Sequence, residues 1–195
     1  MAKLTFMYGT MSSGKSIELM KVAYNYESQH RRVLVLTSQL DNRFSEKHDV
    51  VSRTGMTHSA KPIGPDTNLL ALWQEMENPV DSILIDEAQF LTPEQVDDLA
   101  LIVDYGEIDV WTFGLKNDAF NHLFPGSEEL IIMADKLVEL KTMCAFCESK
   151  AIMNVRTVDN IPVFSGEQIA VGDSNYYSVC RYHYSNMKQT QMLPE

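Results

Sequence analysis

A glycine-rich run near the N-terminus constrains this chain more than any other feature: Gly9-Thr10-Met11-Ser12-Ser13-Gly14-Lys15-Ser16. The run fits the pattern G-x-x-x-x-G-K-[ST] at every fixed position. The apolar segment 4–8 before it has the character of a strand, and the segment 17–23 after it has that of a helix. A strand, a glycine turn and a helix in this order predict a loop whose backbone N–H groups and helix N-terminus bind phosphate.

Two side chains at the end of this run suit the same chemistry. The Lys15 ammonium can reach the β- and γ-phosphates of a nucleotide, and the Ser16 hydroxyl can ligate Mg²⁺. Glycine is needed where a side chain would block the approach of phosphate to the backbone. The alternative is a glycine turn that merely precedes a lysine.

A pair of acids follows a buried strand predicted over 82–86. Asp86 ends this strand, which is the position of the acid that completes the Mg²⁺ shell in P-loop enzymes. Glu87 is displaced by one residue and could accept a proton from a substrate hydroxyl, provided that it lies within hydrogen-bond reach. Both acids could instead be solvated groups at the end of a strand.

The remaining pattern predicts an α/β fold, with a parallel sheet flanked by helices. Further strands are expected over 32–38, 108–114 and 136–140, and a helix from Leu69 to near Pro79. Thr92, Pro93 and Gln95 have the spacing of a capping box that opens another helix. The polar stretch 41–66 is expected to be a long loop.

After about residue 142 the sequence changes to short polar strands, cysteines and aromatic residues. We therefore expect a nucleotide-binding domain over 1–141 and a smaller domain over 142–195. Cys144 and Cys147 form one pair with x₂ spacing, and Cys180 and His183 form a second. Thiolate and imidazole ligands favour Zn²⁺, and four protein ligands predict a structural site. Buried packing cysteines and a redox pair at Cys144 and Cys147 are the alternatives.

Composition excludes several classes of protein. The formal charge is −11 and the sequence pI is about 4.8, so a broad nucleic-acid-binding surface is not expected. No apolar run approaches the roughly 18 residues of a membrane span. The N-terminal residues lack the pattern of a signal peptide, and three cysteines cannot all pair within one chain. We therefore expect a cytoplasmic protein with reduced or metal-bound thiols and no membrane partner.

With these motifs in order, the chain resembles the thymidine kinases of the small, tetrameric, P-loop and zinc-binding type found in many bacteria and in animal cytosol. The resemblance covers nearly the whole chain, from Leu4 to His183. The motifs that carry it are the glycine-rich run, the two cysteine-containing pairs and the segments Asp41–Phe44, Asp86–Phe90, Lys136–Lys141 and Tyr177–Arg181.

The resemblance implies roles for individual residues. Glu87 would be the general base for the 5′-hydroxyl of thymidine, and the glycine-rich loop with Lys15 would hold the phosphates of ATP. Ser16 and Asp86 would organise Mg²⁺, and the segment containing Asp86 also places Gln89 on the nucleotide side. Asp41 would assist Mg²⁺ through water, and Arg43 would lie near the transferred phosphate.

The resemblance also implies a substrate pocket and regulation. A "lasso" over roughly 151–177 would hold the base, and Met11, Phe90, Leu115, Ile169 and Tyr176 would line the pocket. Around Asp118–Phe120 the phenylalanine of the family pattern is displaced by one position, so Phe120 is not assigned. Thymidine would be phosphorylated, deoxyuridine tolerated, dTTP bound as a feedback inhibitor, and a homotetramer formed.

Two other functions share parts of these motifs. Asp86–Gln89 resembles the second motif of helicases, but one domain supplies no second ATP-binding lobe and the charge is acidic. A nucleotide-sensing zinc module that binds without turnover is the non-enzymatic alternative. Formation of thymidine monophosphate from ATP and thymidine would distinguish the three.

Overall fold

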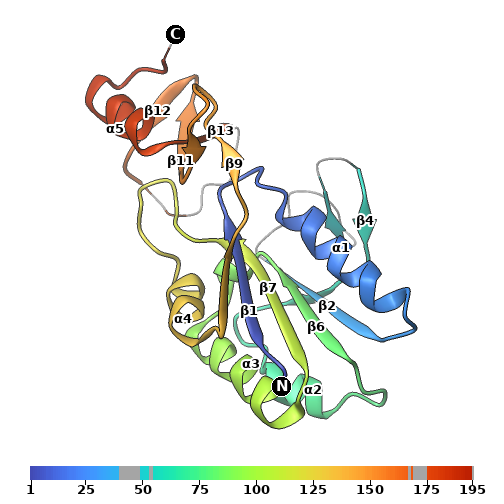
Figure 1. The fold of residues 1–195 in the computed structure, drawn as a ribbon. Helices are drawn as coiled ribbons and strands as arrows, with labels where there is room; N and C mark the ends of the chain where they lie inside the picture. Colours follow the sequence, from blue (N-terminus) through green and yellow to red (C-terminus); the bar gives the residue numbers. More distant parts are fainter. Residues whose placement is uncertain (40–48, 53–54, 167, 169–174, 195) are drawn as a thin grey trace.

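The computed structural model describes residues 1–39, 49–52, 55–166, 168 and 175–194. Its centre is a six-stranded sheet with the order β5-β2-β6-β7-β1-β8, in which every neighbouring pair is parallel (Figure 1). The strands are β1 (Leu4–Gly9), β2 (Val33–Ser38), β5 (Lys61–Ile63), β6 (Ser82–Asp86), β7 (Asp109–Leu115) and β8 (Lys136–Glu139). The predicted parallel sheet is confirmed.

Helices cover both faces of this sheet, as expected for parallel strands joined by crossovers. On one face, Leu19, Met20 and Ala23 pack against Leu84 and Phe113 in a buried cluster. The opposite face packs against the other three helices of this part of the chain. The helices are α1 (Lys15–Glu27), α2 (Leu69–Gln74), α3 (Pro93–Gly106) and α4 (Pro125–Met133), with a 3₁₀ turn, η1 (Ala88–Phe90).

The start of α3 follows the sequence prediction closely. The Thr92 hydroxyl accepts from the Gln95 N–H at 3.2 Å, and the Gln95 side chain accepts from the Thr92 N–H at 3.1 Å. The same Gln95 amide donates to the carbonyls of Gly64 and Thr67 at 2.8 and 2.9 Å. One buried side chain therefore caps the helix and fixes the loop beside it.

The stretch 41–66, predicted as a loop, contains strands among its described residues. β3 (Val50–Val51) and β4 (Thr57–His58) form a short hairpin, and β5 adds an edge strand to the main sheet. Pro62 lies within β5, and an edge strand is where proline is tolerated. The prediction of a loop was wrong for these residues. Strands of two or three residues are too short to show the alternation of apolar and polar side chains that marks a strand in a sequence.

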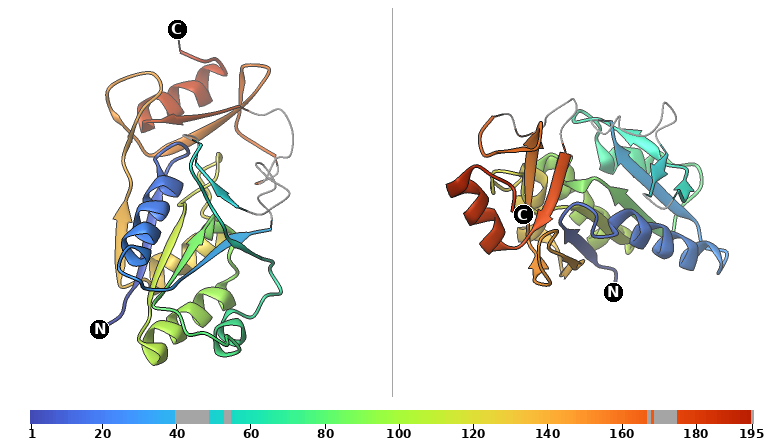
Figure 2. Two further views of the ribbon diagram at one scale, coloured as in Figure 1. Left: turned by 90° about the vertical axis from the view of Figure 1, so that its right-hand side faces the viewer. Right: turned by 90° about the horizontal axis from the view of Figure 1, so that it is seen from above.

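A smaller unit, called the C-terminal lobe here, comprises the described residues from 142 onward. It contains β9 (Thr142–Met143), β10 (Lys150–Ala151), β11 (Met153–Val158), β12 (Ile161–Val163), β13 (Asn175–Val179) and α5 (Arg181–Thr190). The order β12-β11-β13 forms an antiparallel sheet, and this sheet and α5 share a separate apolar cluster around Val155, Val179 and Met187. The lobe lies beyond the end of the main sheet at which β1 leads into α1 (Figures 1 and 2).

Within the described part of the chain, no helix combines the length and apolar character that a membrane crossing requires.

Candidate active site and metal centre

The glycine-rich loop connects the end of β1 at Gly9 to the start of α1 at Lys15. Ser12 and Gly14 both have left-handed backbone conformations, with φ of 62° and 83°. Glycine is needed at position 9 because neighbouring atoms pack closely against its Cα, and not because of its backbone φ. A Cβ at this position would lie 2.3 Å from Ser13 Oγ and 2.6 Å from the Leu140 carbonyl oxygen. The sequence therefore forms a tightly wound turn directly before a helix N-terminus.

Polar groups gather in this turn in a way that fits phosphate. Lys15 Nζ donates to the Thr10 carbonyl at 2.9 Å, which holds the ammonium over the loop. Among the described residues, buried Thr10 Oγ1 and Ser13 Oγ have no hydrogen-bond partner. Buried hydroxyls are normally satisfied, so two such atoms in one loop indicate a site for an external acceptor. A phosphate supplies several acceptor oxygens and the negative charge that Lys15 would balance.

Asp86 joins the loop to the central sheet. Its carboxylate, at the end of β6, accepts a hydrogen bond from Ser16 Oγ at 3.1 Å and another from the Glu87 N–H at 3.0 Å. Burial raises the pKa of Asp86 to about 7, and the Glu87 charge adds to the increase. The hydrogen bond from the Glu87 N–H, the Lys15 charge and the Ser16 hydroxyl oppose this increase in pKa. A buried carboxylate beside a hydroxyl is an oxygen donor set that Mg²⁺ prefers, so these residues fit the predicted cation.

Glu87 is turned away from the strand direction by a left-handed backbone, with φ of 52°. Its carboxylate accepts a hydrogen bond from Gln89 Nε2 at 2.5 Å. The Gln89 side chain is buried, and its Oε1 accepts from the Leu115 N–H at 2.9 Å. Because that N–H occupies the amide oxygen, Gln89 must present its NH₂ group to Glu87. Gln89 was placed on the nucleotide side from sequence, and here its hydrogen bonds go to Glu87 and Leu115.

A small cavity lies beside the two acids. It is lined by Ser38, Ile63, Gly64, Pro65, Ile85, Asp86, Glu87, Phe90, Leu91 and Gln95. Phe90 thus lies next to the candidate base, and its ring packs edge-to-face against Phe124 with centroids 5.7 Å apart. The structure therefore places one predicted pocket residue, Phe90, beside the two acids.

The other predicted substrate residues lie apart from this cavity or outside the described chain. Met11 is in the glycine-rich loop and Leu115 ends β7. Tyr176 is on β13, opposite Arg156 of β11. Asp41, Arg43 and Ile169 fall outside the described residues, so the structure places none of them.

Sequence reasoning missed the residues that join the C-terminal lobe to the main sheet. Asn154 Oδ1 accepts from the Met11 N–H, the Arg156 guanidinium lies 5.0 Å from the Phe120 ring centroid, and the Tyr184 hydroxyl donates to the Ala119 carbonyl. Asn154 and Arg156 are both buried on β11. The one local sign of these two residues is that they alternate with the apolar Val155. Such a pattern normally indicates a strand with one polar, exposed face, whereas both faces of β11 are buried.

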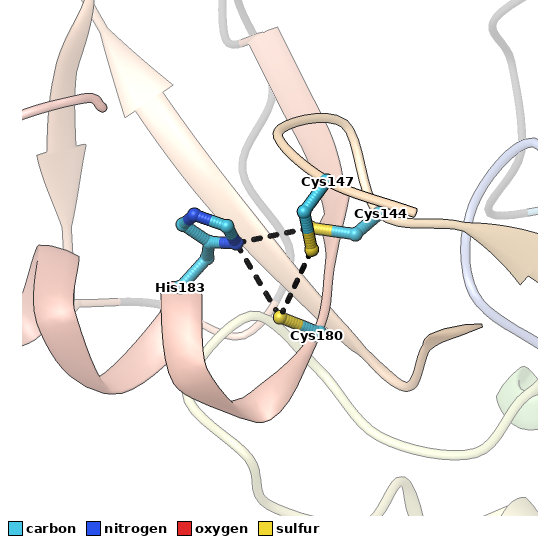
Figure 3. A group of neighbouring side chains, drawn as sticks. All are labelled: Cys144, Cys147, Cys180 and His183. Atoms are coloured by element: carbon cyan, nitrogen blue, oxygen red, sulfur yellow. Dashed lines mark hydrogen bonds between the residues drawn. The ribbon is translucent and has the colours of Figure 1, made fainter. Parts of the chain in front are cut away.

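The four predicted metal ligands converge at one point of this lobe (Figure 3). Cys144 and Cys147 come from the turn between β9 and β10, while Cys180 and His183 come from the start of α5. His183 Nδ1 lies 3.4 Å from both Cys144 Sγ and Cys180 Sγ, and Cys147 Sγ lies 3.8 Å from Cys180 Sγ. The four ligand atoms all lie within 4.8 Å of one another.

These separations fit a tetrahedral zinc site. Bond lengths of about 2.3 Å to sulfur and about 2.0–2.1 Å to nitrogen place sulfurs about 3.8 Å apart and sulfur and nitrogen about 3.6 Å apart. All three cysteines are free thiols, and the 3.8 Å between Cys147 Sγ and Cys180 Sγ is well beyond the length of an S–S bond. Hydrogen bonds from the side chain and backbone of Ser149 lower the pKa of Cys147 to about 6. A thiolate is the form that binds metal.

The loop after β1 is hydrogen-bonded to the acid at the end of β6, a parallel strand that β7 separates from β1 in the sheet. This arrangement defines the class: a P-loop nucleotide-binding protein, with a four-ligand metal lobe added. The thymidine kinase family model matches residues 2–184. The chain therefore belongs to the thymidine kinase family.

Individual relatives agree with this assignment. The chain is 51% identical over 185 residues to a thymidine kinase of Lactiplantibacillus plantarum, covering 94% of this chain and 96% of the relative. It is 49% identical over 195 residues to one of Streptococcus thermophilus, covering 100% and 99% respectively. Among solved structures, Bacteroides Pif1 bound to single-stranded DNA matches 71% of this chain and 38% of the Pif1 chain, with 14% sequence identity and a TM-score of 0.38. This similarity is too low to bear on the fold or the function.

Proposed function

We propose that this protein transfers the γ-phosphoryl group of ATP to the 5′-hydroxyl of thymidine, giving thymidine monophosphate and ADP. The observation that carries the proposal is the Lys15–Ser16–Asp86 arrangement beside Glu87, in a chain of the thymidine kinase family. Phosphoryl transfer requires alignment and charge neutralisation, and the described site provides groups for both.

The phosphate side of the reaction falls to the glycine-rich loop. Lys15 would balance charge on the β- and γ-phosphates, and backbone N–H groups at the start of α1 would bind their oxygens. Ser16 and Asp86 would hold Mg²⁺, which neutralises phosphate charge when it is bound. Because Asp86 has a raised pKa, it would lose a proton as the cation binds.

The nucleoside side of the reaction falls to Glu87. The carboxylate would accept the 5′-hydroxyl proton as the oxygen attacks phosphorus. Gln89 would hold this carboxylate by its NH₂ group, since the Leu115 N–H fixes the orientation of the amide. Phe90 would border the sugar and base, because it lines the cavity next to Glu87.

Finer parts of the proposal rest on the family resemblance. These are tolerance of deoxyuridine, inhibition by dTTP, a homotetramer, a cytoplasmic location and a domain boundary after Lys141. The separate apolar cluster of the C-terminal lobe supports the boundary. Exposed Tyr105 on α3 and Ile132 on α4 offer apolar surface that a second copy could cover.

The test is incubation with ATP, Mg²⁺ and thymidine, followed by mass detection of thymidine monophosphate. Glu87→Gln should retain ATP binding and lose kcat by about 10²- to 10⁴-fold, the range typical of a general base. A kcat near that of the unaltered protein would remove Glu87 from this role. ATP hydrolysis stimulated by DNA without nucleoside, or binding of nucleotide without any product, would refute the kinase assignment.

A further inference from the structure

Both peptide groups of Met11 are held by the C-terminal lobe. Its N–H donates to Asn154 Oδ1 at 2.9 Å, and its carbonyl accepts from Ser178 Oγ at 2.5 Å. Asn154 and Ser178 are directly opposite each other on β11 and β13. One cross-strand pair therefore holds one residue of the glycine-rich loop by two hydrogen bonds. Asn154 is 143 residues and Ser178 is 167 residues after Met11 in the sequence. We call this set of two hydrogen bonds the Met11 clamp.

The clamp is linked to the cysteine turn by backbone hydrogen bonds. The carbonyl of Ser178 accepts from the Ala145 N–H at 2.9 Å, and Ala145 lies between the ligands Cys144 and Cys147. Ser178 is also two residues before Cys180. The same residue thus contacts the metal-binding turn through its backbone and the phosphate loop through its side chain.

The clamp acts on a loop that needs external support. Ser12, the next residue after Met11, has a φ of 62°, which is uncommon for a residue other than glycine. Such a conformation is strained and persists only where its surroundings fix it. Fixing both peptide groups of the preceding residue supplies that constraint.

We propose that Asn154 and Ser178 are positioning residues for ATP, and that through them the C-terminal lobe sets the affinity of the phosphate loop. The inference rests on the proposed binding of ATP to this loop. If only a fraction of the molecules hold the binding conformation, the apparent affinity falls by that fraction. The clamp raises the fraction without touching a phosphate.

The experiment measures ATP binding directly, by titration with a fluorescent ATP analogue, in Asn154→Ala, Ser178→Ala and the double variant. Loss of one hydrogen bond should weaken binding about 3- to 10-fold, and loss of both should weaken it by more than either alone. The kcat at saturating ATP should stay within about twofold, since the reacting groups are unchanged. Ser178→Thr keeps the hydroxyl and should restore binding.

Thr157→Val is the matched control. Thr157 is buried on the same strand and donates to the Asn175 carbonyl at 3.3 Å, so its replacement removes a β11–β13 hydrogen bond that does not reach the loop. ATP affinity should be unchanged in this variant. Metal content of every variant is measured, because a metal-depleted lobe would weaken binding by another route.

Removing metal with a chelator gives a second measure. The unaltered protein should then lose ATP affinity, while the double variant should lose much less, because its lobe no longer holds Met11. ATP affinity that is unchanged in metal-replete Asn154→Ala/Ser178→Ala would overturn the clamp while leaving the kinase proposal intact. Equal weakening in Thr157→Val would also overturn it. Failure of the unaltered protein to bind ATP would overturn the proposed function and its clamp together.

Discussion

Replacing Asp86 with asparagine should stabilise the ligand-free protein at pH 8. The carboxylate is 5% exposed and sits beside Glu87, and these surroundings raise its pKa from 3.8 to about 7. Asparagine can keep both present hydrogen bonds. Its Oδ1 accepts from the Glu87 N–H, and its NH₂ group donates to the Ser16 hydroxyl, reversing the existing bond.

The direction and the size of this stability gain follow from the link between proton binding and folding. The folded protein binds the Asp86 proton more tightly than the unfolded chain does, so this residue's contribution is most favourable below the unfolded pKa and is lost as pH rises through the folded pKa. Because the pKa of Asp86 rises from 3.8 in the unfolded chain to about 7 in the folded protein, ionisation of this carboxyl destabilises the fold. Relative to low pH, this destabilisation is at most about 4 kcal/mol at pH 8 and about 2 kcal/mol at pH 5. The stability gain of Asp86→Asn should therefore grow by about 2–3 kcal/mol between pH 5 and pH 8.

Urea unfolding at both pH values, followed by circular dichroism, measures this gain. Asp81→Asn is the control, because Asp81 is an exposed carboxylate just before the start of the same strand and removing it relieves no burial. Glu87→Gln should reduce the pH dependence, since the Glu87 charge contributes to the raised pKa of Asp86. An Asp86→Asn variant no more stable than the unaltered protein at pH 8, or with an equal gain at both pH values, would refute the argument.

Three other substitutions separate the roles of the site residues. Gln89→Ala leaves the partly buried Leu115 N–H without its side-chain acceptor and should cost about 1–3 kcal/mol in urea unfolding while lowering kcat; an unchanged kcat would mean that Gln89 does not hold Glu87. Cys180→Ser removes one of four ligands, so elemental analysis should find less than one zinc per chain and the Tm should fall; full zinc occupancy would contradict the site. Gly9→Ala places a Cβ 2.3 Å from Ser13 Oγ, so both ATP affinity and stability should drop, by about 1–3 kcal/mol for stability; an unchanged Kd and Tm would show that the loop yields easily.

The sequence predicts those features whose signal is local. The glycine-rich run, the capping box of Thr92 and Gln95 and the paired cysteine motifs each lie within a few residues. The structure places the run between a strand and a helix, forms the capping box and brings the cysteine motifs together. The strand 82–86 and its terminal acid were also predicted, because a short apolar run followed by an acid is a local pattern.

Features that depend on distant partners escaped prediction. α4 and α5 were not predicted, and neither carries a side-chain N-terminal cap among the described residues. The contacts of Asn154, Ser178 and Arg156 join segments far apart in sequence, so no local pattern marks them. Gln89 was assigned by motif similarity, whereas its observed partners include Leu115, 26 residues away.

The position of β1 has a consequence for synthesis of the chain. This first strand pairs with β7 on one edge and β8 on the other, and these strands begin 105 and 132 residues after it at Asp109 and Lys136. A growing polypeptide that has emerged from the ribosome only as far as α3 would therefore present β1 with both edges bare, and such edges invite aggregation. Truncated nascent chains ending near residue 105 should need chaperone protection that chains extended beyond β8 do not.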